Sequence, residues 1–137
     1  TKGVIEPMKR RGGGVIINAS SFAAQIPSVG QSVYAAAKSG VKSFTRVSAA
    51  ELAPYNIRTF AYIPGVIKTQ LVAPLIEDPQ NAERMKNDIA AHRFGEPSEV
   101  ALVVVFLASE RAGYVSGTSI EVAGGKFCVQ NPGKIYE

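Results

Sequence analysis

The sequence predicts an α/β protein built around a parallel β-sheet, and two observations lead to this fold class. Three short segments have the character of strands in a covered sheet: 15–18, 57–63 and 119–122. A segment with helical periodicity lies between each of these strands and the next. Because two parallel strands need a long crossover connection, strands that alternate with helices are typical of a parallel sheet. With 46% hydrophobic and 19% charged residues, the 137-residue chain has the composition of one globular domain.

The first half of the chain gives clear boundaries for its elements. Three basic residues at 9–11 are typical of the last turn of a helix, where cations interact favourably with the helix dipole, and the glycines at 12–14 end that helix. The first strand follows. From Gln31 to about Tyr55, apolar residues recur every three to five positions, which predicts a long helix. One face of this helix carries small residues on which another backbone can pack closely, either in a core or at a subunit interface: Ala35, Ala36, Ser39, Gly40 and Ser43.

The second half is less regular. Pro64 and Gly65 end the second strand, because neither residue suits the interior of a parallel ladder. The segment Val66–Arg93 contains two prolines and has weak helical periodicity, so we expect a mobile lid there rather than part of a core. A further helix begins near Pro97, with acidic residues at its positive end.

Composition and charge exclude several classes of function. The net charge of +4 includes one basic cluster, at 9–11, with no aromatic stacking platform beside it, so we expect no binding of nucleic acid. Cys128 is the single cysteine, which fits a reducing cytoplasm. The longest apolar run, Val100–Ala108, is shorter than the roughly 20 residues of a membrane-spanning helix. We expect a cytoplasmic protein without a membrane partner, and no metal site, because His92 has no second ligand nearby and should face solvent.

The chemistry is indicated by Tyr34 and Lys38, which are four residues apart in the predicted long helix. That spacing puts the phenol and the ammonium group on one face, with Cβ atoms about 5–6 Å apart. A cation beside a tyrosine stabilises the phenolate, which suits the phenol to general acid or base work. Ser21 lies 13 positions before Tyr34 and follows the first strand, at the edge where open α/β sheets place ligands. The Ser21 hydroxyl is therefore expected to meet the phenol.

Four motifs occur in a fixed order along the chain: Asn18-Ala-Ser-Ser21, Tyr34-x-x-x-Lys38, Pro64-Gly-Val-Ile-Lys-Thr69 and Gly124-Gly125. Their order and intervals resemble those of the short-chain dehydrogenase/reductase family in its most common form. The resemblance extends from about Gly3 to Phe127. It implies the C-terminal part of a Rossmann-type doubly wound parallel sheet, namely its last three strands and their helices.

The resemblance implies an NAD(P)-dependent oxidoreductase that transfers hydride between nicotinamide and a carbonyl or secondary alcohol. Tyr34 would be the general acid or base, Lys38 would stabilise the phenolate and bind the nicotinamide ribose, and Ser21 would orient and polarise the carbonyl. The cofactor, NAD or NADP, would be lined at its nicotinamide and diphosphate end by Pro64, Gly65, Ile67 and Thr69, besides Tyr34 and Lys38. The Ile67 backbone would hold the carboxamide. The resemblance also implies a small-molecule substrate and a homodimer or homotetramer with the small-residue helix face in a subunit contact.

The chain also departs from the family pattern. The glycine-rich phosphate loop, the residue that selects NAD or NADP and the asparagine of the catalytic tetrad all belong upstream of Thr1. We therefore expect residues 1–137 to be the C-terminal catalytic half of one NAD(P)-binding domain, inactive by itself and missing the N-terminal cofactor-binding half. Ala123 stands where relatives often carry Asp, and Phe60 and Tyr62 are bulky for their strand. The tail from Asn131 matches no family motif.

Two other functions compete with the oxidoreductase. A non-catalytic binding or assembly subunit can keep the same fold, but retention of Ser21, Tyr34 and Lys38 together counts against it. A serine hydrolase based on Ser21 needs a G-x-S-x-G turn and a histidine base. Ala19 and Phe22 flank the two serines instead of glycines, and His92 is the one histidine of the chain.

Overall fold

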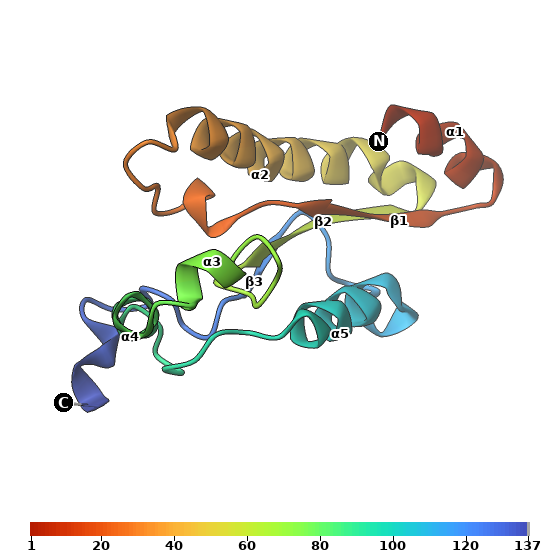
Figure 1. Ribbon diagram of the computed structural model, residues 1–137. Helices are drawn as coiled ribbons and strands as arrows, with labels where there is room; N and C mark the ends of the chain where they lie inside the picture. The colour runs from red at the N-terminus through yellow and green to blue at the C-terminus, as the bar shows by residue number, and fades with distance from the viewer. Residues whose placement is uncertain (137) are drawn as a thin grey trace. The chain divides into compact units, whose positions relative to one another are not determined.

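The computed structural model describes residues 1–136 and confirms the α/β fold class. Its sheet has the strand order β1-β2-β3, with bounds β1 (Gly14–Ala19), β2 (Ile57–Pro64) and β3 (Ser119–Val122) (Figure 1). β1 and β2 are parallel, and Gly14 is opposite Ile57. All three strands were predicted to within one residue at either end. Among the described residues β1 is an edge strand, because β2 is its only neighbour.

Five α-helices and several short 3-10 turns connect the strands. The helices are α1 (Lys2–Arg10), α2 (Ser32–Leu52), α3 (Ala73–Ile76), α4 (Pro79–Asn87) and α5 (Pro97–Ala108). The 3-10 turns are Phe22–Ala24, Ala53–Tyr55, Glu110–Ala112 and Pro132–Tyr136. The long helix predicted for 31–55 is confirmed as α2 with its following turn, and Asn56 ends it in a left-handed conformation, with φ 55°. None of the helices within residues 1–136 is both long and apolar enough to cross a membrane.

The chain forms two compact units, each made from two separate stretches. The first unit comprises residues 1–63 and 103–120, and the second comprises 64–102 and 121–137. In the first unit α2 lies along one face of β1 and β2 (Figure 1). The predicted catalytic residues belong to the first unit and the predicted cofactor segment 64–69 to the second.

The core of the first unit lies on both sides of β2. On one side Ile57 packs with Ile16 and Leu52, and on the other Phe60 packs with Leu107 and Ala112. Phe60 is completely buried, so its bulk fills the space between the strand and the second half of α5.

Arg58 of β2 stabilises the end of α5. Its guanidinium donates to three backbone carbonyl oxygens: those of Leu107 (3.1 Å), Ser109 (3.0 Å) and Ala112 (2.8 Å). The final carbonyls of a helix lack partners within the helix, so a cation that binds them stabilises the helix end. Arg58 thereby fixes the turn that follows α5.

The second unit has a small core of its own. Ala82, Ile89 and Phe94 form a buried cluster, with partly buried Val66, Ile76 and Met85 around it. Two of the three buried residues fall in the segment 66–93. The prediction that this segment lies outside any core is therefore wrong: α4 presents an apolar side that the residues after it cover.

The tail after the paired glycines packs on the residues that follow α4. The Phe127 amide donates to the Asp88 carbonyl at 2.8 Å, and the Tyr136 hydroxyl donates to the Ala90 carbonyl at 2.8 Å. The tail that matched no motif is thus part of the second unit.

Three side chains make contacts that the sequence analysis did not predict. His92 was expected to face solvent, but its Nε2 lies 3.0 Å from Asn87 Oδ1 and 3.1 Å from Glu83 Oε1, and its ring lies 4.5 Å from that of Tyr136. Lys68 pairs with Glu96. The Asn18 amide donates to the Thr45 hydroxyl at 3.0 Å. The partners of Lys68 and Asn18 lie 28 and 27 positions away in the sequence, so local reasoning did not reveal them.

Candidate active site

The predicted catalytic residues come from two neighbouring elements of the first unit. β1 ends at Ala19, and Ser20 and Ser21 continue the chain beyond the strand. α2 begins at Ser32, so Tyr34 lies in its first turn and Lys38 one turn later. The carboxyl end of the strand and the amino-terminal part of the helix thus present all three side chains within one compact unit.

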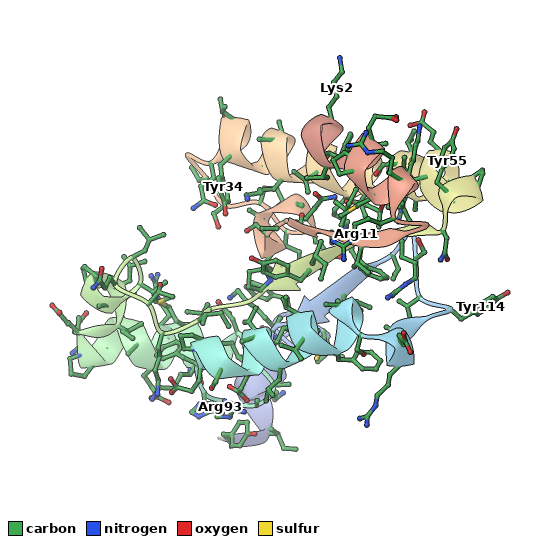
Figure 2. All side chains as sticks on the ribbon, turned by 90° about the vertical axis from the view of Figure 1, so that its right-hand side faces the viewer. Lys2, Arg11, Tyr34, Tyr55, Arg93 and Tyr114 are labelled. Atoms are coloured by element: carbon green, nitrogen blue, oxygen red, sulfur yellow. The ribbon has the colours of Figure 1, made fainter. Side chains whose placement is uncertain are left out.

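Tyr34 and Lys38 lie next to one another on α2. The Lys38 ammonium is 5.7 Å from the centre of the Tyr34 ring and donates to the Ala19 carbonyl at 3.0 Å. An ammonium group has three N–H donors, so further donors remain for a ligand. Tyr34 is 47% exposed, and Figure 2 shows its side chain at the start of α2. A ligand can therefore reach the phenol while the cation stays close to it.

The Ser21 hydroxyl is oriented by the turn that follows it. Ser21 is the N-cap of the 3-10 turn Phe22–Ala24, and its Oγ accepts a hydrogen bond from the Ala23 amide at 3.2 Å. Because this bond uses a lone pair, the hydroxyl proton stays available for donation. A carbonyl oxygen is the kind of partner that such a donor can polarise. No hydrogen bond links Ser21 to Tyr34 within residues 1–136, so the expected meeting of hydroxyl and phenol is not seen directly.

The predicted cofactor segment of the second unit begins with closely packed backbone at Gly65. The Gly65 amide donates to the Val122 carbonyl at 3.0 Å. A Cβ atom at Gly65 would lie 2.8 Å from the Cα atom of Ala123, so only glycine fits without a shift of backbone. Pro64 precedes it as the last residue of β2.

Ile67 presents its backbone groups in a direction set by Gly95. The flanking Val66 carbonyl accepts from the Gly95 amide at 2.9 Å, and the Lys68 amide donates to the Gly95 carbonyl at 2.9 Å. In such a parallel bridge the amide and carbonyl of the middle residue point away from the partner. The Ile67 backbone can thus offer both a donor and an acceptor, which is what a carboxamide needs.

Thr69 closes the predicted cofactor segment at the surface. Its carbonyl accepts from the amides of Val72 (3.0 Å) and Ala73 (2.9 Å), which start the short helix α3. The exposed side chain leaves the hydroxyl accessible to a ligand such as a phosphate group.

A cavity of about 80 Å³ lies within the second unit beside this segment. Its lining includes Val66, Ile67, Gly95 and Ala123, and also an ion pair of Arg93 and Glu99. The Arg93 guanidinium donates to both carboxylate oxygens, at 2.8 and 2.7 Å. These bonds, with a further one from the Glu96 amide, lower the pKa of Glu99 from 4.5 to about 2. The pair fixes the strand-like segment that contains Gly95 to the start of α5.

One contact at the catalytic residues was not predicted from the sequence. Ser20 is buried, and its hydroxyl donates to the backbone carbonyl of Lys38 at 2.9 Å. The serine doublet after the strand was the available signal, but the sequence analysis gave a role only to Ser21.

Comparison with known proteins agrees with the motifs. A family model described as enoyl-(acyl carrier protein) reductase matches residues 1–126. The human protein dehydrogenase/reductase SDR family member 4 is 42% identical over 125 residues, which are 91% of this chain and 45% of that protein. Acetoacetyl-CoA reductase of Shinella zoogloeoides is 43% identical over 122 residues, 89% of this chain and 50% of that protein.

Solved structures give the same result. A 7α-hydroxysteroid dehydrogenase in complex with NADH and 7-oxo glycochenodeoxycholic acid matches with a TM-score of 0.86 and 32% identity, covering 91% of this chain and 49% of that one. A gluconate 5-dehydrogenase from Burkholderia cenocepacia with NADP and tartrate matches with a TM-score of 0.88 and 30% identity, covering 93% and 50%. The chain spans about half the length of the relatives it matches. With the family match over residues 1–126 and these relatives, the chain belongs to the short-chain dehydrogenase/reductase family.

Proposed function

We propose that this chain carries the catalytic residues of an NAD(P)-dependent oxidoreductase acting on a carbonyl or a secondary alcohol. One observation carries the proposal: in a member of this family, the Lys38 ammonium lies 5.7 Å from the Tyr34 ring and binds the strand end that leads to Ser21. A subunit that only binds or assembles has no need of this arrangement.

Each residue has a distinct part in the proposed reaction. Tyr34 exchanges a proton with the substrate oxygen, and Lys38 favours the phenolate form. The Ser21 hydroxyl donates a hydrogen bond to the same oxygen and polarises it. The nicotinamide, when bound, supplies or accepts the hydride. The direction of proton transfer at Tyr34 then follows the direction of the reaction.

The second unit supports a nicotinamide cofactor through its backbone. Gly65 lets the backbone after β2 pack closely on Ala123, and the amide and carbonyl of Ile67, which point away from Gly95, match a carboxamide. Pro64 and Thr69 flank them. NAD and NADP share this end of the molecule, so both are candidates.

An activity assay of the protein that carries this chain tests the proposal. We expect oxidation of NADH or NADPH with at least one of the substrates of its relatives, acetoacetyl-CoA, a keto-gluconate or a 7-oxo bile acid. Tyr34→Phe should lower turnover about 10²- to 10⁴-fold, because acid–base help is lost, and it should leave the cofactor dissociation constant nearly unchanged. Tyr55→Phe is the matched control, since Tyr55 is also a half-exposed tyrosine of the first unit. Turnover of Tyr34→Phe within tenfold of the unchanged protein would contradict the assignment.

We further propose that residues 1–137 form the C-terminal catalytic half of one NAD(P)-binding domain, because the matched stretch is about half of each relative. Isothermal titration of the 137-residue chain with NAD and with NADP should show no binding, since no glycine-rich phosphate loop is present in it. Clean micromolar binding would show this proposal to be wrong.

One face of α2 is suited to a contact between copies of the protein. An apolar strip on α2 is exposed and includes Val33 (82%), Phe44 (48%) and Val47 (57%), beside Ala36 and Gly40. We expect this face to form a contact between copies in a homodimer or homotetramer. The single cysteine fits the cytoplasm as the place of action.

A further inference from the structure

Lys38 makes two hydrogen bonds that run in opposite directions between α2 and the end of β1, one with Ser20 and one with Ala19. The Ser20 hydroxyl donates to the Lys38 backbone carbonyl at 2.9 Å. The Lys38 ammonium donates to the Ala19 carbonyl at 3.0 Å. One residue of the helix therefore accepts from the strand end with its backbone and donates to the strand end with its side chain.

The position of Ser20 leaves it little freedom. Ser20 is 3% exposed. Its amide donates to the Tyr62 carbonyl of β2 at 3.0 Å, while its hydroxyl bonds α2. Ser20 is thus held by the sheet on one side and by the helix on the other, and Ser21 is the next residue in the chain.

We infer that Ser20 is a positioning residue for the proposed reaction, which acts by fixing the Ser21 hydroxyl relative to Tyr34 and Lys38. The inference rests on the proposed function. Ser20 touches neither substrate nor cofactor in this role. Its hydroxyl sets the distance between the end of β1, which carries Ser21, and the turn of α2 that carries the tyrosine and the lysine.

The size of the effect follows from how reaction rates depend on geometry. A catalytic group displaced by about 1 Å can cost about 100-fold in rate. We expect Ser20→Ala to fold, because the Lys38 carbonyl lies inside α2 and keeps its bond within the helix. The strand end is then tied to α2 by the more exposed Lys38 side chain and by the hydrogen bond of Asn18 with Thr45, and neither bond involves the residue next to Ser21.

The first experiment measures kcat and KM of Ser20→Ala in the protein that carries the chain. We expect kcat to fall about 10- to 100-fold, with KM changed less than threefold, and Ser20→Thr to restore most of the rate because it keeps the hydroxyl. Ser48→Ala is the matched control. Ser48 is equally buried, and its hydroxyl also donates to an α2 carbonyl, that of Phe44 at 2.7 Å, but it lies within the helix and away from the strand end. Its rate should stay within twofold.

A double-mutant cycle distinguishes positioning from a structural role. If Ser20 acts through Ser21, the Ser20→Ala change should cost less than twofold in a Ser21→Ala background, because the group it positions is gone. A full additional loss in that background, or an unchanged kcat in Ser20→Ala alone, overturns the inference. If Tyr34→Phe is inactive while Ser20→Ala behaves like the unchanged protein, only this inference fails. A protein that is inactive with every ketone tested overturns the proposed function as well.

Discussion

The two units of the molecule are stabilised in different ways. The first unit is held by buried apolar clusters around β2 and by hydrogen bonds to neutral acceptors, such as those of Asn18 with Thr45 and of Arg58 with the carbonyls at the end of α5. Within residues 1–136, its one ion pair joins Lys9 to Glu6 on α1. The second unit has a smaller core and contains the other ion pairs: Lys68–Glu96, Lys86–Glu83, His92–Glu83, Arg93–Glu99 and Lys126–Asp88.

This difference shows which changes each unit should tolerate. The predicted catalytic residues lie on elements that pack around buried apolar clusters, and this packing responds to changes of side-chain volume. The predicted cofactor segment is positioned by backbone contacts and partly exposed charges, which respond to close packing of the backbone, to pH and to salt. Three predictions test this contrast, starting with the largest expected effect.

Removal of the largest buried side chain should affect the first unit most. Phe60→Ala should lower the free energy of unfolding by about 3–5 kcal/mol, because it leaves a cavity between β2 and α5. Denaturation by urea measures this loss. Phe106→Ala is the control, since Phe106 is 47% exposed and its removal should cost far less. Equal effects of the two changes would contradict a core centred on Phe60.

Two glycines should respond to alanine with opposite signs. A Cβ atom at Gly65 overlaps with the backbone of Ala123, so Gly65→Ala should destabilise by about 1–3 kcal/mol. A Cβ atom at Gly40 meets nothing within 4 Å, so Gly40→Ala in α2 should stabilise an unassembled chain by about 0.5–1 kcal/mol. Thermal unfolding measures both. Light scattering of Gly40→Ala also tests assembly, because an added methyl group should weaken a close helix contact between copies.

The smallest effect should be a loss of order in the second unit at low pH. Hydrogen bonds from Arg93 and the Glu96 amide lower the pKa of Glu99 to about 2, from 4.5. A lowered pKa in the folded state means that this pair stabilises the fold above pH 4.5, and that its contribution disappears as the pH falls from 4.5 towards 2. Amide signals of residues 93–99 should therefore change in this range, and should do so at higher pH in 0.5 M salt, a concentration of roughly three times the physiological level.

Glu99→Gln is the matched variant for the acid transition. It keeps the size of the side chain and removes the charge, so the change between pH 4.5 and 2 should disappear. An acid transition that is the same in Glu99→Gln, or that affects both units together, would show that this ion pair does not control it.

The sequence predicted those features that depend on neighbouring residues. The strands of the first unit were found because their residues are apolar in short runs, and the Tyr34–Lys38 pair because a helix repeats at four residues. The cluster of Ala82, Ile89 and Phe94 was missed because a helix end at Asn87 interrupts any periodicity among its members. The surroundings of His92 depend on Tyr136, which lies far along the chain and outside every family motif. The contact of Ser20 with Lys38 likewise arises only when strand and helix pack together.

The two-stretch construction of the first unit has a consequence for synthesis on the ribosome. β2 emerges with residues up to 63, but Leu107 and Ala112, which cover Phe60, are added only after some 40 further residues. At about 5–20 residues per second, this interval is about 2–8 seconds. During that time the apolar face of the nascent sheet that contains Phe60 is exposed to solvent. We expect ribosome-bound chaperones to bind the chain at this stage. A translational pause between the codons for residues 64 and 102 of this chain should increase aggregation.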